Sequence, residues 1–184
     1  LQSVVWLVTD ASWVETPGLT MILFIASATA LLLSRVALFS PLLHVGGLAV
    51  GIVVVLWQTS NLTAAAGVVG HLREVASRLD AWYEAATTGG ISTDLLPFAI
   101  SVMAGAWALG YLGSWSIFRN TNVWTVVVLG GVAMLTVLSF LPREIEYTSR
   151  FFLFVFVAML LVVRVGSIQR HRAWRAAQVR FEPS

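Results

Sequence analysis

The chain has 184 residues and a net charge of +2, and only 11% of its residues are charged whereas 58% are apolar. Soluble domains carry about 25% charged residues, so this composition excludes an ordinary soluble domain and predicts a membrane protein, for which lipid is the main solvent. Cysteine is absent and no basic stripe marks a soluble segment, which excludes thiolate chemistry and cysteine-based metal centres in this chain and argues against a nucleic-acid partner.

The apolar segments are long and continuous, which predicts membrane helices. A bilayer core of about 30 Å needs about 20 helical residues, and continuous runs differ from the alternating pattern of a membrane β-barrel. The sequence opens inside a shorter run at 1–9 without a charged leader, and we interpret this run as a partial span of a longer chain. Five full spans are expected, at 18–34, 41–57, 95–118, 123–141 and 151–168. The predicted fold is therefore an all-α polytopic membrane helix bundle.

The second full span contains His44, whereas His71 and His171 are expected outside the membrane. Haem ligated by two histidines needs both histidines at the same depth in the membrane, and the expected spans contain a single histidine. A lone intramembrane histidine is either a functional ligand or a residue satisfied at a helix interface. His44 lies three residues after Pro41, near the end of the span, and this position favours a histidine satisfied at a helix interface. We therefore expect no cofactor, no metal ion and no catalytic residue in this chain.

The segment 62–88 lies between the second and third full spans and has apolar residues at helical spacing on one face. The other face is polar, with Arg73, Ser77, Asp80 and Glu84. A helix this polar does not span a bilayer. In one interpretation it lies on the outer membrane surface, with Trp82 and Tyr83 at headgroup level. In the other, its apolar stripe packs on the bundle or on a partner subunit.

Asp94 precedes the third full span and is expected to cap it, since a carboxylate is favourable near a helix N-terminus. Small residues in the third and fourth spans allow close helix approach, from which helices in lipid gain contact. We expect Trp107, Gly110 and Gly113 to share one packing face and Leu109 to lie on another face that meets lipid. The candidate packing or interface residues are Trp107, Gly110, Tyr111, Gly113, Trp115, Arg119 and Trp124. None of the nine acids falls in the middle of an expected span, which disfavours an ion or proton path.

The two ends of the expected bundle differ in charge. One end holds four Arg and eight acidic residues, and the other holds seven Arg and one acidic residue. Arg in short flanking segments marks the cytoplasmic side of a membrane protein. We therefore predict that the basic tail at 169–184, and with it the C-terminus, is cytoplasmic and that 62–88 is extracellular.

Residues 89–124 read GGISTDLLPFAISVMAGAWALGYLGSWSIFRNTNVW. This segment resembles the N-terminal membrane region of bacterial transglutaminase-like membrane proteins of the TgpA type, at Gly89, Gly90, Ser92, Asp94, Phe98, Trp107, Gly110, Tyr111, Trp115, Phe118, Arg119 and Trp124. The resemblance extends over most of the chain and is strongest from 80 to 180. It implies a location in the bacterial plasma (inner) membrane, and a longer parent with one further span and an extracellular transglutaminase-like domain. That reaction needs Cys, His and Asp, so the resemblance assigns no catalytic residue to a chain without cysteine.

Two functions from different classes fit the sequence. The first is a non-catalytic membrane anchor or scaffold region of a transglutaminase-like membrane protein. The second is an accessory structural subunit packed on a larger membrane complex, such as a respiratory or photosynthetic electron-transfer complex. Membrane lipids are expected partners in both, and other membrane protein subunits are expected partners in the second.

Overall fold

The computed structural model describes residues 1–14, 16–141 and 145–176, and these residues fold into α-helices joined by short connections. Seven α-helices and one short 3-10 helix occur in these three ranges: α1 (Gln2–Ala11), α2 (Leu19–Ser34), α3 (Ser40–Thr59), η1 (Ser60–Leu62), α4 (Val68–Thr88), α5 (Leu96–Phe118), α6 (Trp124–Phe140) and α7 (Ile145–Ala176). The all-α class predicted from the sequence is confirmed.

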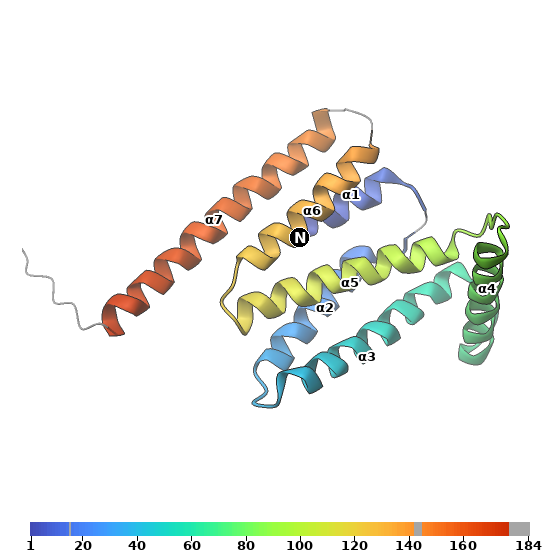
Figure 1. The fold of residues 1–184 in the computed structure, drawn as a ribbon, viewed down its shortest axis with the longest axis horizontal. Coiled ribbons are helices and arrows are strands. Elements are labelled where there is room, and N and C mark those ends of the chain that lie inside the picture. Colours follow the sequence, from blue (N-terminus) through green and yellow to red (C-terminus); the bar gives the residue numbers. More distant parts are fainter. Residues whose placement is uncertain (15, 142–144, 177–184) are drawn as a thin grey trace, which may run out of the picture.

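Helix α5 occupies the centre of the bundle and packs against α2, α3, α4 and α6 (Figure 1). The α2–α5 pair makes the most extensive contact between two helices. The chain passes back and forth, so the C-termini of α2 and α5 lie at one end of the bundle with the N-termini of α3 and α6. Helix α4 lies crosswise at the opposite end, beside the C-terminus of α3 and the N-terminus of α5. The elements that carry most of the acidic residues and those that carry most of the arginines therefore lie at opposite ends.

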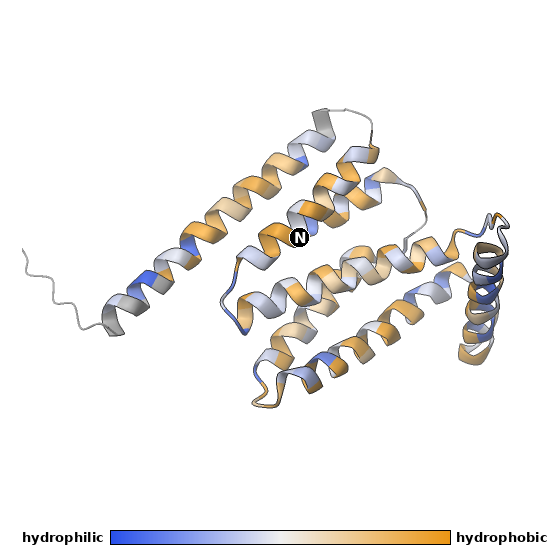
Figure 2. Ribbon diagram, in the orientation of Figure 1, coloured by the Kyte–Doolittle hydropathy of each residue, from blue (hydrophilic) through white to orange (hydrophobic). Residues whose placement is uncertain are grey.

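Three helical stretches are long and apolar enough to cross a membrane: Ser40–Leu62, Leu96–Phe118 and Tyr147–Ile168. Two further apolar helices, Leu19–Ser34 and Trp124–Phe140, are shorter. At about 1.5 Å per residue, 16 or 17 residues extend about 24–26 Å, which is less than a bilayer core of about 30 Å. The five expected full spans thus divide into three of full length and two short ones. Figure 2 shows apolar residues dominating α6 and the middle of α7, with polar residues in the last part of α7.

Several helix bounds differ from those expected from the sequence. The partial span expected at 1–9 forms α1 and ends at Ala11. The amphipathic helix expected from residue 62 begins at Val68, because Gly67 adopts φ 77° and ψ 157°, a conformation that favours glycine and interrupts a helix. Helix α7 continues to Ala176, since Gln, Arg and Ala are good helix formers and no proline follows Ile168 within it. The first part of the expected basic tail is therefore helical.

Parts of the expected charge pattern and of the tail lie outside the described residues. These are residues 177–184 of the tail and residues 15 and 142–144 of the connections, which include Glu15, Arg143, Glu144, Arg180 and Glu182.

Two apolar cores form inside the bundle, and α1 contributes to both. The larger core lies between α2, α3 and α5, where Ile22, Ala26 and Met103 are fully buried. The smaller core lies between α1, α6 and α7 and is centred on Leu7 and Met134. Side chains of α1 enter the larger core through Val5 and the smaller core through Val4 and Leu7.

Trp107, Gly110 and Gly113 of α5, which were expected to share one packing face, contact different neighbours. A Cβ at Gly110 would lie 2.9 Å from Ala26 Cβ on α2, whereas a Cβ at Gly113 would lie 3.0 Å from a methyl of Leu1 and 3.4 Å from one of Val126. Three residues turn a helix by about 300°, which is about 60° short of a full turn. Side chains three residues apart therefore point in directions that differ by about 60°, and each faces a new neighbour. Leu109, for which lipid contact was the expected surrounding, is partly buried and packs against the smaller core.

The close approach of α2 and α5 can be tested at Gly110. Leucine there must displace Ala26 and the backbone of Leu23, whose carbonyl oxygen lies 3.1 Å from the added Cβ, so Gly110→Leu should destabilise the bundle by about 1–3 kcal/mol. The matched control is Gly105→Leu on the same helix, where nothing lies within 4 Å of the added Cβ. The control should be neutral or slightly stabilising, since leucine is the better helix former. Thermal unfolding in detergent measures both, and equal stability of the two variants would contradict the packing.

Candidate functional site

Three aromatic side chains form a stacked column on the face of α5 that meets α3. Trp107, Tyr111 and Trp115 are spaced by four residues, which places them on one side of a helix, and all three are buried. The rings of Trp107 and Tyr111 are 6.5 Å apart with 8° between their planes, and those of Tyr111 and Trp115 are 6.0 Å apart with 28° between their planes. We call these three residues the aromatic column.

Two glycines of α3 make room for the aromatic column. A Cβ at Gly47 would lie 2.4 Å from Tyr111 Cζ, and a Cβ at Gly51 would lie 2.4 Å from Trp107 Nε1. Any side chain at either position would overlap an aromatic ring, so α3 approaches α5 at this distance only because both residues are glycine. Sequence reasoning missed these two glycines. Their spacing of four, matched to the aromatic spacing of four on α5, is the signal that could have identified them.

His44 joins the aromatic column at the end nearer the α2–α3 connection. Tyr111 donates its hydroxyl hydrogen to the Leu43 carbonyl at 3.4 Å, and the same hydroxyl lies 3.2 Å from His44 Nδ1. With that hydrogen directed to Leu43, the hydroxyl oxygen accepts a hydrogen bond from Nδ1–H. The imidazole also packs on Trp115, with ring centroids 4.6 Å apart. The structure thus places His44 at a helix interface, with its contacts made inside the chain.

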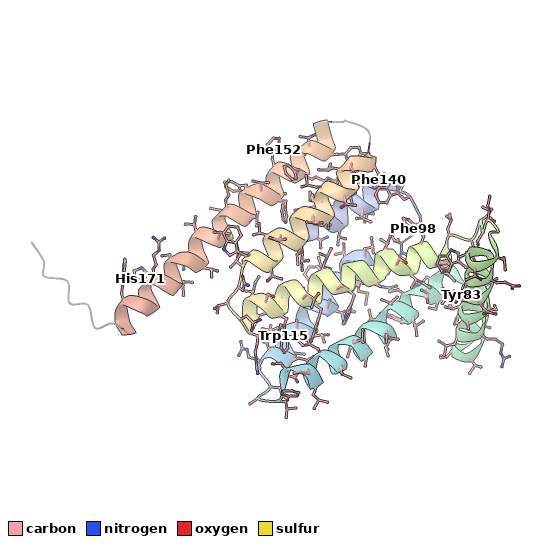
Figure 3. The ribbon with its side chains drawn as sticks, viewed as in Figure 1. Tyr83, Phe98, Trp115, Phe140, Phe152 and His171 are labelled. Atoms are coloured by element: carbon pink, nitrogen blue, oxygen red, sulfur yellow. The ribbon has the colours of Figure 1, made fainter. Side chains whose placement is uncertain are left out.

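Arg119 closes the same end of the bundle. Its Nη1 donates to the carbonyls of Ser34 and Val36, both at 3.1 Å, and its guanidinium lies 5.8 Å from the centre of the Trp115 ring. The last carbonyls of a helix have no partner within that helix, so Arg119 satisfies the C-terminus of α2 from the C-terminus of α5. Trp115 lies at this end of the bundle (Figure 3), while Phe98 of α5 and Phe140 of α6 lie at the opposite end.

The seven candidate residues therefore separate into three groups. The aromatic column lies on the side of α5 that meets α3, and Arg119 packs on Trp115 at the end of the column. Gly110 and Gly113 face α2 and the α1–α6 side instead. Trp124 is 64% exposed at the start of α6, where Asn122 Oδ1 accepts the Trp124 backbone N–H.

An ion pair holds α4 across the opposite end of the bundle. Arg78 of α4 donates from Nε to Asp94 Oδ2 at 2.6 Å and from Nη2 to Asp94 Oδ1. Glu74, four residues before Arg78, adds a weaker contact at 3.7 Å. Asp94 Oδ1 also accepts the Leu96 backbone N–H at 2.9 Å, so Asp94 satisfies a donor at the start of α5, although Leu95 occupies the N-cap position. The link from Asp94 to Arg78 was missed, because residues 16 positions apart carry no periodic signal.

The environment of Asp94 favours its charged form. The hydrogen bonds from Arg78 lower the pKa of Asp94, and partial burial opposes them without reversing the shift. The same interaction raises the pKa of Arg78. The ion pair is therefore fully formed at neutral pH and fixes the position of α4 relative to α5.

Among the described residues, no group of three or more His, Cys, Asp or Glu side chains could hold a metal ion. Comparisons of the chain with protein-family models, with curated proteins and with solved structures find no match. The arrangement consists of packing contacts and of polar links between helices, which include an ion pair between Arg150 of α7 and Asp10 of α1.

The fit of the aromatic column against α3 generates a direct test. Gly51→Ala places a methyl group against Trp107, so the variant should lose about 1–3 kcal/mol of stability. Gly46→Ala is the matched control, because nothing lies within 4 Å of an added Cβ there. Thermal unfolding in detergent, followed by tryptophan fluorescence, compares them. A Gly51→Ala variant as stable as Gly46→Ala would show that α3 and α5 do not meet through these residues.

The Arg78–Asp94 pair predicts a pH dependence. The folded pKa of Asp94 is lowered, so its contribution is present above the unfolded value of about 3.9 and is lost as the pH falls through the lowered folded value. Asp94→Asn should lower stability at pH 7 by about 1 kcal/mol, given a partly exposed pair. The difference from the unsubstituted chain should shrink progressively as the pH falls below about 3.9. Asp80→Asn on the exposed side of α4 is the control, and melting temperatures across this pH range give the readout.

Proposed function

We propose that this chain is a non-catalytic, multi-pass membrane region that anchors and scaffolds by helix packing. The observation that carries the proposal is the exposure of α7. Almost none of its apolar stretch Tyr147–Ile168 is buried within the chain. Phe152, Phe156 and Val163 are each more than 60% exposed along it. Soluble monomers rarely expose a continuous apolar surface of this length, whereas lipid solvates it without cost.

In this proposal α2, α3, α5, α6 and α7 cross the plasma membrane of a bacterium and α1 is a partial span. The arrangement of the ends supports this embedding. Arg78, Asp94 and the rest of α4 lie at one end of the bundle and Arg119 lies at the other, so the charged links lie outside the apolar middle. The excess of arginine at the α2–α3 end makes that end, and the C-terminus of α7, cytoplasmic. Helix α4 then lies on the outer surface.

The scaffold belongs, in our proposal, to a transglutaminase-like membrane protein of the TgpA type. The support is the sequence pattern from Gly89 to Trp124, within which the aromatic column and Arg119 form one connected packing unit. A full-length gene sequence tests this assignment. A downstream extracellular domain with Cys, His and Asp supports it, and an open reading frame that ends near Ser184 contradicts it.

A second function is favoured by the small contact area of α7. The main contacts of this helix within the described chain are with α1 and α6, and helices in lipid gain stability from further close contacts. An accessory subunit of a larger membrane complex would bury the open face of α7 against a neighbouring subunit. Co-purification after mild solubilisation separates the two functions, because a stoichiometric partner lost on Phe156→Ala supports the subunit.

The embedding and its orientation are tested with single cysteines, since the chain contains none. Ser77→Cys in α4 should react with a membrane-impermeant thiol reagent on intact cells, and Ser167→Cys in α7 should react only after permeabilisation. Alkaline carbonate should leave both variants in the membrane fraction. The reverse labelling pattern would overturn the orientation, and release by carbonate would overturn the membrane embedding.

A further inference from the structure

A cavity of about 500 Å³ lies between the end of α3 and the start of α4. Its size is within the range of about 300–1,000 Å³ that small-molecule sites occupy. The residues that matter to its chemistry are Val53, Trp57 and Ser60 on the α3 side, and Val68, His71 and Leu72 on α4. No acidic side chain is among the residues that line the cavity.

The wall of the cavity is apolar and the chain leaves it uncovered. Val53 and Val68 are 66% and 75% exposed, and Trp57 and Leu72 are about half exposed. Val53 precedes Trp57 by one helical turn, so the wall continues along α3 from the end of the helix toward the middle of the bundle. This exposed apolar wall can be covered by a long apolar chain that follows α3.

The polar groups of the cavity are gathered at the level where α3 ends and are held in place by one another. Thr63 donates its hydroxyl hydrogen to the Ser60 carbonyl at 3.1 Å and lies 2.5 Å from His71 Nδ1. With that hydrogen directed to Ser60, the Thr63 oxygen accepts from Nδ1–H, and His71 Nε2 is the ring nitrogen left for another partner. The Ser60 hydroxyl itself donates to the Trp57 carbonyl at 2.6 Å, and its oxygen can still accept.

We propose that this cavity binds one glycerophospholipid molecule from the surrounding membrane. One acyl chain lies against Val53, Trp57 and Leu72, and the polar head group lies beside Ser60 and His71. The inference rests on the proposed membrane function, because α3 is then a span whose end lies at headgroup level. A molecule with a polar head and a long apolar tail matches both parts of the cavity. His71 Nε2 and the Ser60 oxygen are left as hydrogen-bond acceptors, so they fit a donor of the head group, such as an ammonium or hydroxyl group.

The experiment uses the full chain in phospholipid nanodiscs with a small fraction of a phospholipid that carries a photoactivatable diazirine in its acyl chain. After irradiation, mass spectrometry measures the labelled peptides from 53–72 and from α7. We expect the cavity peptides to be labelled beyond their share of exposed surface and to lose the label when unlabelled phospholipid is in excess.

Two substitutions fill the cavity from opposite sides. Leu72→Trp on α4 and Val53→Trp on α3 should each reduce labelling of the cavity peptides about tenfold, with labelling of α7 unchanged. The matched control is Leu79→Trp, two turns further along α4 and outside the cavity, which should label as the unsubstituted chain does. Equal melting temperatures of the three variants establish that the fold is kept.

The outcomes distinguish this inference from the proposed function. Labelling of the cavity peptides in proportion to exposure, or unchanged by both filling substitutions, overturns the bound lipid while the embedded scaffold stands. Displacement of the label by an isoprenoid quinone at a concentration where phospholipid fails also overturns it, because the occupant is then a quinone. No labelling of α7 or of any other helix overturns the membrane embedding itself.

Discussion

Close contact at α5 is the constraint on which the rest of the bundle depends. A helix that leaves water for lipid has no further hydrophobic gain to make by meeting another helix, so association relies on van der Waals contact at short range. In this chain the short range is obtained by glycine on both sides of the contact: Gly110 of α5 lets α2 approach, and Gly47 and Gly51 of α3 receive the aromatic column. Because α5 contacts α2, α3, α4 and α6, a change in its position moves most of the bundle.

The two ends of α5 are fixed by polar links of different kinds. At its C-terminus Arg119 binds carbonyls at the end of α2, which sets the relative height of the two helices. At its N-terminus Asp94 accepts the Leu96 backbone N–H and binds Arg78, which sets the direction of α4. Both links use a side chain that serves a helix end and a second element at once. Between these ends, Tyr111 of α5 makes a polar contact with Leu43 and His44 of α3.

The sequence was sufficient to predict the elements but only part of their assembly. Continuous apolar runs and the amphipathic stripe of 62–88 identified the helices, because each depends on periodicity within a short segment. The bounds of α7 were missed, since Arg and Gln continue a helix beyond its apolar part without any change of propensity. For the site, Trp107, Tyr111 and Trp115 were identified, but their partners Gly47 and Gly51 lie on another helix. Which helix faces which is set by tertiary packing, and a single sequence does not encode it as a local pattern.

The unequal lengths of the helices have a consequence for the bilayer around the protein in the proposed embedding. Helix α6 is 17 residues long and exposes Val128, Val132 and Leu135 outward, whereas α3 has 20 residues and continues into η1. Lipid that contacts α6 meets a hydrophobic height of about 25 Å, less than the resting core of about 30 Å. The mismatch is relieved by thinning the bilayer on that flank, at a fraction of a kcal/mol per Å. The protein would then sit in an asymmetric membrane, thinner beside α6 than beside α3, and would partition toward thinner bilayers.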